Sequence, residues 1–124
     1  MANRKRVVMI GLHPKVVDYG KYPGLTPEQL EAALNGDVAR LGELGIDAAV
    51  CFVDHGETAA ETVMAALAEA RPDIVLIGAG VRSDPAEFLL FERLVNLVHE
   101  QAPAARLCFN TGSADSVAAV QRWL

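Results

Sequence analysis

Four short runs of β-branched and other apolar residues recur along the chain, and a segment with helical periodicity follows each of them. The runs span residues 6–12, 47–54, 73–80 and 105–110. Runs this apolar are typical of strands covered on both faces, and helices between successive strands favour parallel pairing. The pattern therefore predicts an α/β fold, a three-layer α/β/α sandwich around a parallel sheet of about four strands.

The helical segments start at recognisable capping residues and carry an apolar stripe. Three pairs have capping-box spacing, in which the first side chain caps and the second reaches back: Thr26 and Gln29, Thr58 and Glu61, Asp84 and Glu87. The stripe of the first helix consists of Leu30, Leu34, Val38, Leu41 and Leu44, and Gly45 is its expected stop. These signals predict helices over residues 26–45, 58–71, 83–103 and 111–124.

The strand order follows from connection rules rather than from any single residue. Crossovers between parallel strands are right-handed, and small doubly wound sheets commonly have a flavodoxin-like order. We therefore expect order 2-1-3-4, flavodoxin-like but without a fifth strand. A simple 1-2-3-4 order, with all helices on one face, would leave the other face of very apolar strands bare.

Length and composition restrict the class of protein. The chain has 124 residues, 52% of them apolar, which predicts a single domain over 1–124. The net charge of -5 argues against nucleic acid as a partner, and no apolar run approaches the ~18 residues of a membrane helix. Cys51 and Cys108 lie in strand-like runs outside any CxxC or zinc pattern, which predicts reduced thiols in a cytoplasmic protein.

A long irregular segment, residues 12–26, separates the first strand from its helix. A loop of this length is uncommon in a compact domain unless it is functional or mobile. In order 2-1-3-4 the crossovers after strands one and three leave for opposite faces, so a crevice opens at their carboxyl ends. We expect residues 12–26 to form one wall of that crevice and residues 79–84 the other.

The leading functional hypothesis is a small anionic ligand, bearing phosphate or carboxylate, bound at this edge. Helix N-termini favour anions there, although several aspartates share the edge. The candidate ligand-binding residues offer positive charge, close backbone approach, or hydroxyl and amide groups: Lys15, Lys21, Gly78, Gly80, Arg82, Ser83, Asn110, Thr111 and Ser113. The P-loop pattern and the GxGxxG fingerprint after strand one are both missing, so the cofactor is unknown.

A second hypothesis is a small enzyme with acid–base or metal-assisted chemistry. His13 and His55 follow adjacent strands and have Asp18 and Asp54 near them in the sequence. The spacing of these candidate catalytic residues matches no known metal signature, so no metal ligand is assigned.

A third hypothesis is a protein-interaction domain without a ligand. The segment 88–98 is apolar on more than one helical face, and the fourth strand is a potential open edge. A homodimer could form through either surface. The alternative is that the last helix and Trp123 cover both the helix face and the strand edge.

The strand–helix layout resembles that of phospho-receiver domains and of cobalamin-binding domains. The second likeness lies in "GETAAETVMAALAEARPDIVLIGAG", a capped helix that leads into a glycine-ended strand. The receiver pattern needs acidic residues where this chain has "IGLH" and "IGAG", and the cobalamin pattern needs DxHxxG where it has "LHPKVVDYG". The resemblance therefore implies the fold alone and assigns no functional residue.

Overall fold

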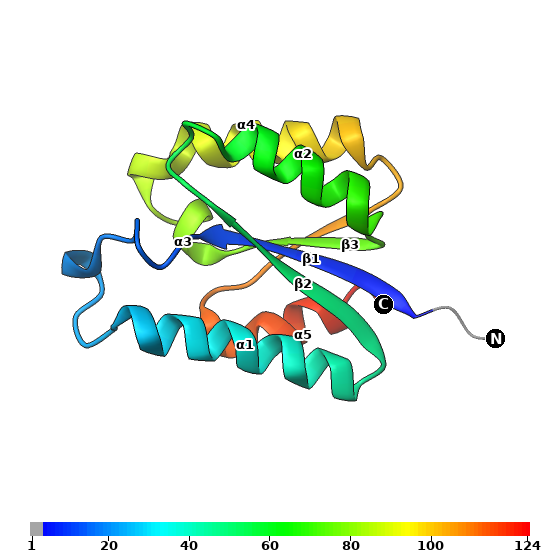
Figure 1. Cartoon of the computed structure of the whole chain (residues 1–124), viewed down its shortest axis with the longest axis horizontal. Helices are drawn as coiled ribbons and strands as arrows, with labels where there is room; N and C mark the ends of the chain where they lie inside the picture. The colour runs from blue at the N-terminus through cyan, green and yellow to red at the C-terminus, as the bar shows by residue number, and fades with distance from the viewer. Residues whose placement is uncertain (1–3) are drawn as a thin grey trace.

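The computed structural model describes residues 4–124 as a four-stranded parallel sheet between two layers of helices (Figure 1). The strands are β1 (Lys5–Leu12), β2 (Ile46–Val53), β3 (Ile74–Ile77) and β4 (Arg106–Phe109). Their order is β2-β1-β3-β4, and all neighbours are parallel. The predicted α/β fold, strand order and flavodoxin-like topology are confirmed.

The helices divide between the two faces of the sheet. Figure 1 shows α2 (Ala59–Ala70) and α4 (Phe88–Gln101) on one side, and α1 (Pro27–Glu43) with α5 (Ser116–Gln121) on the other. Three short 3₁₀ turns precede helices: η1 (Tyr19–Lys21), η2 (Pro85–Glu87) and η3 (Ser113–Asp115). Within residues 4–124, no helix combines the length and apolarity needed to cross a bilayer.

Alternate side chains of β1 enter two separate apolar cores. Val8 and Ile10 pack with α2 and α4, whereas Val7 and Met9 pack with α1 and α5. All four side chains are buried. Because both faces of β1 are covered, its sequence is an unbroken apolar run instead of an alternating one.

The third predicted strand is shorter than expected. The run 73–80 leaves the sheet after Ile77, and a single helical turn, α3 (Ala79–Arg82), follows. The amide of Gly78 still bonds to the Ile10 carbonyl, but the Ala79 amide donates to Asn110 Oδ1 at 2.8 Å. The Asn110 side chain, which follows β4, therefore accepts from the amide that would otherwise continue the strand, and β3 ends there.

Two of the predicted helices also begin later than the sequence indicates. Segment 83–103 is helical only from Phe88, after η2, and segment 111–124 divides into η3 and α5. In both cases a capping aspartate tightens the first turn: Asp84 accepts from the Ala86 amide, and Asp115 from the Thr111 and Gly112 amides.

One predicted capping box is confirmed and two are wrong. Thr26 and Gln29 exchange reciprocal bonds of 3.1 and 3.0 Å. Thr58 makes no cap bond, because its own amide and hydroxyl donate to Asp54. Asp84 does cap its turn, but the Glu87 side chain does not reach back.

The apolar stripe of α1 is only partly covered. Leu41 is fully buried, while Leu30 and Leu34 are half-buried and Leu44 is 39% exposed. The stripe thus meets protein near its middle and leaves its N-terminal half facing open space.

The second apolar face of α4 is mostly packed against the same molecule. Leu90, Leu94 and Val98 are buried, and Phe91 packs edge-on against Phe109 with ring centroids 5.9 Å apart. The remaining large exposed apolar side chains of α4 are Phe88 and Leu89, at 57% and 74% exposure.

Candidate functional site

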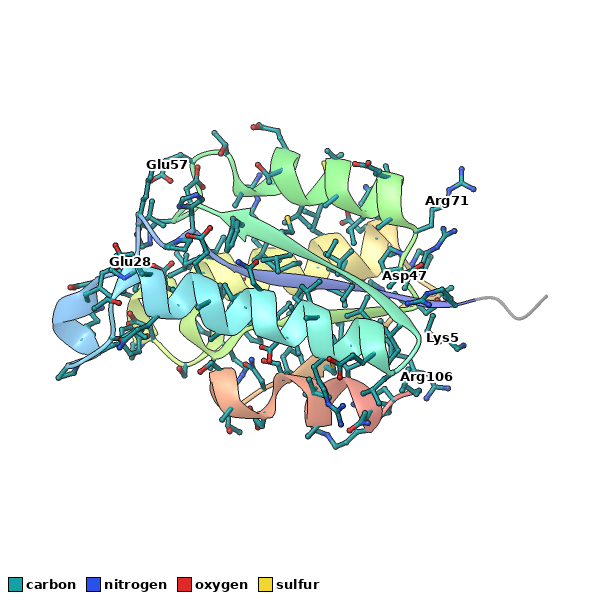
Figure 2. The ribbon with its side chains drawn as sticks, turned by 60° about the horizontal axis from the view of Figure 1, so that its bottom comes forward. Lys5, Glu28, Asp47, Glu57, Arg71 and Arg106 are labelled. Carbon is teal, nitrogen blue, oxygen red and sulfur yellow. The ribbon has the colours of Figure 1, made fainter. Side chains whose placement is uncertain are left out.

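A cavity of about 620 Å³ lies at the carboxyl end of the sheet, beyond β3 and β4. We call it the switch-point cavity. It is bounded by the β1–α1 loop and the first turns of α1 on one side, and by the segments after β3 and β4 on the other. Figure 2 labels Glu28 and Glu57 at this end of the molecule, and Lys5, Arg71 and Arg106 at the opposite end.

Unequal strand lengths create the space. Ile10 of β1 pairs with Ile77, the last residue of β3, and Ile77 pairs with Phe109, the last of β4. Gly11 and Leu12 continue β1 past that line and line the cavity. The crossovers after β1 and β3 leave for opposite faces, so neither covers the gap.

One wall of the cavity carries most of its apolar side chains. One of these apolar side chains comes from the end of β1, two come from the loop after it and three from α1: Leu12, Val17, Leu25, Leu30, Ala33 and Leu34. All six are half-buried. The half-buried stripe of α1 is thereby explained, because its N-terminal half faces the cavity.

The opposite wall is largely backbone with small side chains. It comprises residues 78–80 and 111–113, held in place by Asn110. The Asn110 side chain accepts from the Ala79 amide and donates to the Ser116 hydroxyl at 2.9 Å. Because Asn110 and Ser116 are buried, this bridge fixes the loop after β3 against the start of α5.

Partly exposed His55 and buried Glu87 form a pair at the rim of the cavity. His55 Nδ1 contacts the Glu87 carboxylate, and its Nε2 lies 2.7 Å from the Val16 carbonyl oxygen. The Glu87 side chain is only 7% exposed. The Glu87 carboxylate, followed by the Val16 carbonyl, raises the pKa of His55, because the imidazolium can donate to both acceptors.

Two of the three positively charged candidates, Lys21 and Arg82, are already engaged. Lys21 Nζ lies 2.7 Å from Asp84, an ion pair that raises the pKa of Lys21 and lowers that of Asp84. Arg82 Nη2 donates to the Asn110 carbonyl at 2.6 Å, and Arg82 does not line the cavity.

The loop amides predicted to cradle an anion instead bind side chains of their own loops. Asp115 accepts from the Thr111 and Gly112 amides and, at 2.8 Å, from the Thr111 hydroxyl. The Thr111 hydroxyl is the main reason that the pKa of Asp115 is lowered. Asp54 does the same after β2, where the Thr58 hydroxyl chiefly lowers its pKa to about 2.

Most of the candidate residues from the sequence do gather at the cavity. Those that line it are Asp18, Lys21, His55, Gly78, Gly80, Ser83, Asn110, Thr111 and Ser113. His13, Lys15, Asp54 and Arg82 do not line it. The His13 ring packs edge-on against Phe52, and its Nδ1 accepts from the Lys15 amide at 3.0 Å.

The two histidines therefore do not meet as a catalytic pair inside the cavity. Over residues 4–124, no cluster of three or more His, Cys, Asp or Glu side chains is arranged to hold a metal ion.

Sequence reasoning missed two parts of the site. Leu30, Ala33 and Leu34 have the spacing of a core stripe, which carries no sign that half of it faces a cavity. Glu87 has the spacing of a capping residue, although its partner is a histidine 32 residues earlier. The sequence carries no usable signal for the first, because the run 73–80 predicts a strand as long as its neighbours.

Neither a protein-family model nor a curated protein matches this chain.

Proposed function

We propose that the protein binds a small amphipathic molecule, uncharged or nearly so, in the switch-point cavity. The observation that carries the proposal is the cavity itself. Its volume of about 620 Å³ falls within the range of roughly 300–1,000 Å³ typical of ligand pockets. Its position at the point where the strand order reverses is where sheets of this kind bind ligands.

The two walls favour an amphipathic ligand. Half-buried aliphatic groups of Leu30, Ala33 and Leu34 on one side would gain by being covered. Polar residues on both walls, such as Gln29 of α1 and Ser113 after β4, also line the cavity and offer hydrogen bonds to a ligand. This combination is usual for small-molecule sites, in which a few polar groups fix orientation.

The charge distribution favours a neutral ligand over the anion predicted from the sequence. Asp18, Asp84 and Glu87 line the cavity, and Lys21 and His55 are its basic lining residues. Both basic side chains are paired with carboxylates, so an anion would have to displace one of those carboxylates. An anionic ligand remains a prediction with weaker support.

Binding has more support than catalysis. Both ring nitrogens of His55 already have acceptors, and the protonated ring has no lone pair with which to take up a proton. His13 and Asp54 lie outside the cavity lining. Acid–base or metal-assisted chemistry by these residues stays a prediction.

A reducing, cytoplasmic setting also remains our inference. Cys51 and Cys108 are free and buried, and burial raises the pKa of Cys108 to about 11. Such thiols are unreactive and need no oxidising compartment. A homodimer also stays a prediction. Phe88 and Leu89 form an exposed apolar surface that a second copy could cover, and sedimentation would measure the oligomeric state.

The proposal is tested by titrating ¹⁵N-labelled protein with benzamide, cyclohexanecarboxamide and inorganic phosphate, and following the amide resonances. We expect at least one carboxamide to shift Gly80 and Gly112, which line the cavity. Ala33→Phe should abolish these shifts by filling the cavity. Ala32→Phe, at an exposed neighbouring position of α1, should preserve them.

Two outcomes would overturn the proposal. In the first, neither carboxamide shifts the cavity amides selectively, or Ala33→Phe and Ala32→Phe respond to the carboxamides in the same way. The other is a cavity response to phosphate alone, which would restore the anionic ligand.

A further inference from the structure

We infer that the ligand carries a planar ring, which lies in a slot between α1 and a glycine-lined wall of the switch-point cavity. The inference rests on the proposed function and deepens it by naming the shape of the ligand. Three glycines that line the cavity carry it: Gly11, Gly80 and Gly112.

Backbone conformation does not require glycine at these positions. Within residues 4–124, the glycines whose φ lies in the left-handed region are Gly24, Gly45 and Gly56, none of which lines the cavity. Gly80 even lies inside the helical turn α3, where glycine is a poorer choice than alanine. The reason for glycine there must lie outside local geometry.

Internal packing does not require it either. Apart from its chain neighbours and, for Gly80, the backbone of its own helical turn, a Cβ built at Gly11, Gly80 or Gly112 would have no protein atom within 4 Å. By contrast, a Cβ at Gly78 would come within 3.3 Å of the Ile10 carbonyl oxygen. Most other described glycines also have open space around a Cβ, but Gly11, Gly80 and Gly112 combine that space with a position in the lining of the cavity.

The wall opposite the glycines consists mainly of aliphatic side chains. Leu30, Ala33 and Leu34 project from a regular helix that is capped at Thr26 and anchored by fully buried Leu41. Aliphatic groups on one side and bare peptide groups on the other match the two faces of a flat ring. Such a ring gains a large contact area while losing little conformational freedom.

Matched pairs of neutral compounds test the inference: benzamide with cyclohexanecarboxamide, and 2-naphthamide with decahydronaphthalene-2-carboxamide. Each pair shares its carboxamide and differs in ring thickness. We expect the planar member to bind about tenfold more tightly, measured from the amide shifts of Gly80 and Gly112.

Substitution locates the slot. Gly80→Val should weaken binding of 2-naphthamide by at least about tenfold, because its side chain would occupy the slot. Gly36→Val is the control, since Gly36 lies on the exposed face of α1 and also has open space around a Cβ. If Gly80→Val does not fold, Gly80→Ala gives a milder version of the same test.

The outcomes separate the inference from the proposed function. Equal binding of planar and saturated members would overturn the planar ring and leave the small-molecule site in place. An absence of cavity shifts with all four compounds would overturn both. A preference for planar members that Gly80→Val does not alter would overturn the slot.

Discussion

The imidazole of His55 bridges the carboxylate of Glu87 and the carbonyl oxygen of Val16. This contact joins three segments that are distant in the sequence: the loop after β1, the loop after β2 and the start of α4. Because the loop after β1 also supplies part of the apolar wall, the bridge holds one side of the switch-point cavity in place.

The His55 bridge predicts a stability that falls as pH rises. The pKa of His55 is raised in the folded protein. The contribution of the bridge to stability is therefore complete below the ordinary histidine value of about 6.5 and is lost as pH rises through the folded pKa. Thermal unfolding followed from about pH 6 to about pH 9 should therefore show a declining midpoint.

Two variants identify the residue responsible for this decline. His55→Gln should flatten it, whereas His99→Gln, at an exposed position near the end of α4, should retain it. A decline that persists in His55→Gln would contradict the assignment.

Asp54 predicts the opposite dependence in acid. Its folded pKa of about 2 is depressed by the Thr58 hydroxyl and loop amides. It contributes stability above the ordinary aspartate value of about 3.9, and this is lost as pH falls toward the folded pKa. Urea unfolding between these values should be less pH-dependent in Asp54→Asn than in the wild type. Glu31→Gln on the exposed face of α1 should behave like the wild type, and the same behaviour in Asp54→Asn would refute the prediction.

Arg82 is expected to act in stability and not in anion binding. Its guanidinium donates to the Asn110 carbonyl, and its buried Nε has no partner among the described residues. Arg82→Ala should cost about 1–3 kcal/mol of unfolding free energy, because the partly buried carbonyl loses its donor. Isothermal titration with phosphate should give the same result as for the wild type. A selective loss of phosphate binding would instead support the role predicted from the sequence.

The capping box of α1 is expected to contribute measurably. Thr26→Ala removes the bond to the Gln29 amide and should destabilise the protein by about 1 kcal/mol in chemical denaturation. Thr62→Ala, inside α2, should change stability by no more than about 0.5 kcal/mol. Equal effects of the two substitutions would argue against a specific cap.

The two faces of α4 predict a sharp contrast between neighbouring leucines. Leu94 is fully buried, so Leu94→Ala should lower the unfolding free energy by about 2–5 kcal/mol. Leu89 is 74% exposed, and Leu89→Ala should alter it by less than about 0.5 kcal/mol. If Leu89→Ala proves comparably destabilising, a partner must cover that face, and sedimentation of both variants would reveal it.

The sequence by itself determined the architecture and the edge of the sheet at which the site lies. Strand and helix periods are local, so Val7–Ile10 and the Thr26–Gln29 box could be recognised from neighbouring residues alone. Connection rules then placed the polar loops at one edge, and most of the predicted site residues do line the cavity there.

Only the tertiary structure decided how those residues are used. An apolar stripe indicates which face of α1 avoids water, but whether that face meets protein or a cavity depends on how far β1 extends beyond β3. Likewise, Glu87 and Asp115 have the spacing of capping residues. Glu87 instead binds His55, and Asp115 accepts from the loop amides that were predicted to bind a ligand. These roles depend on contacts and strand lengths that are set only when distant segments pack together.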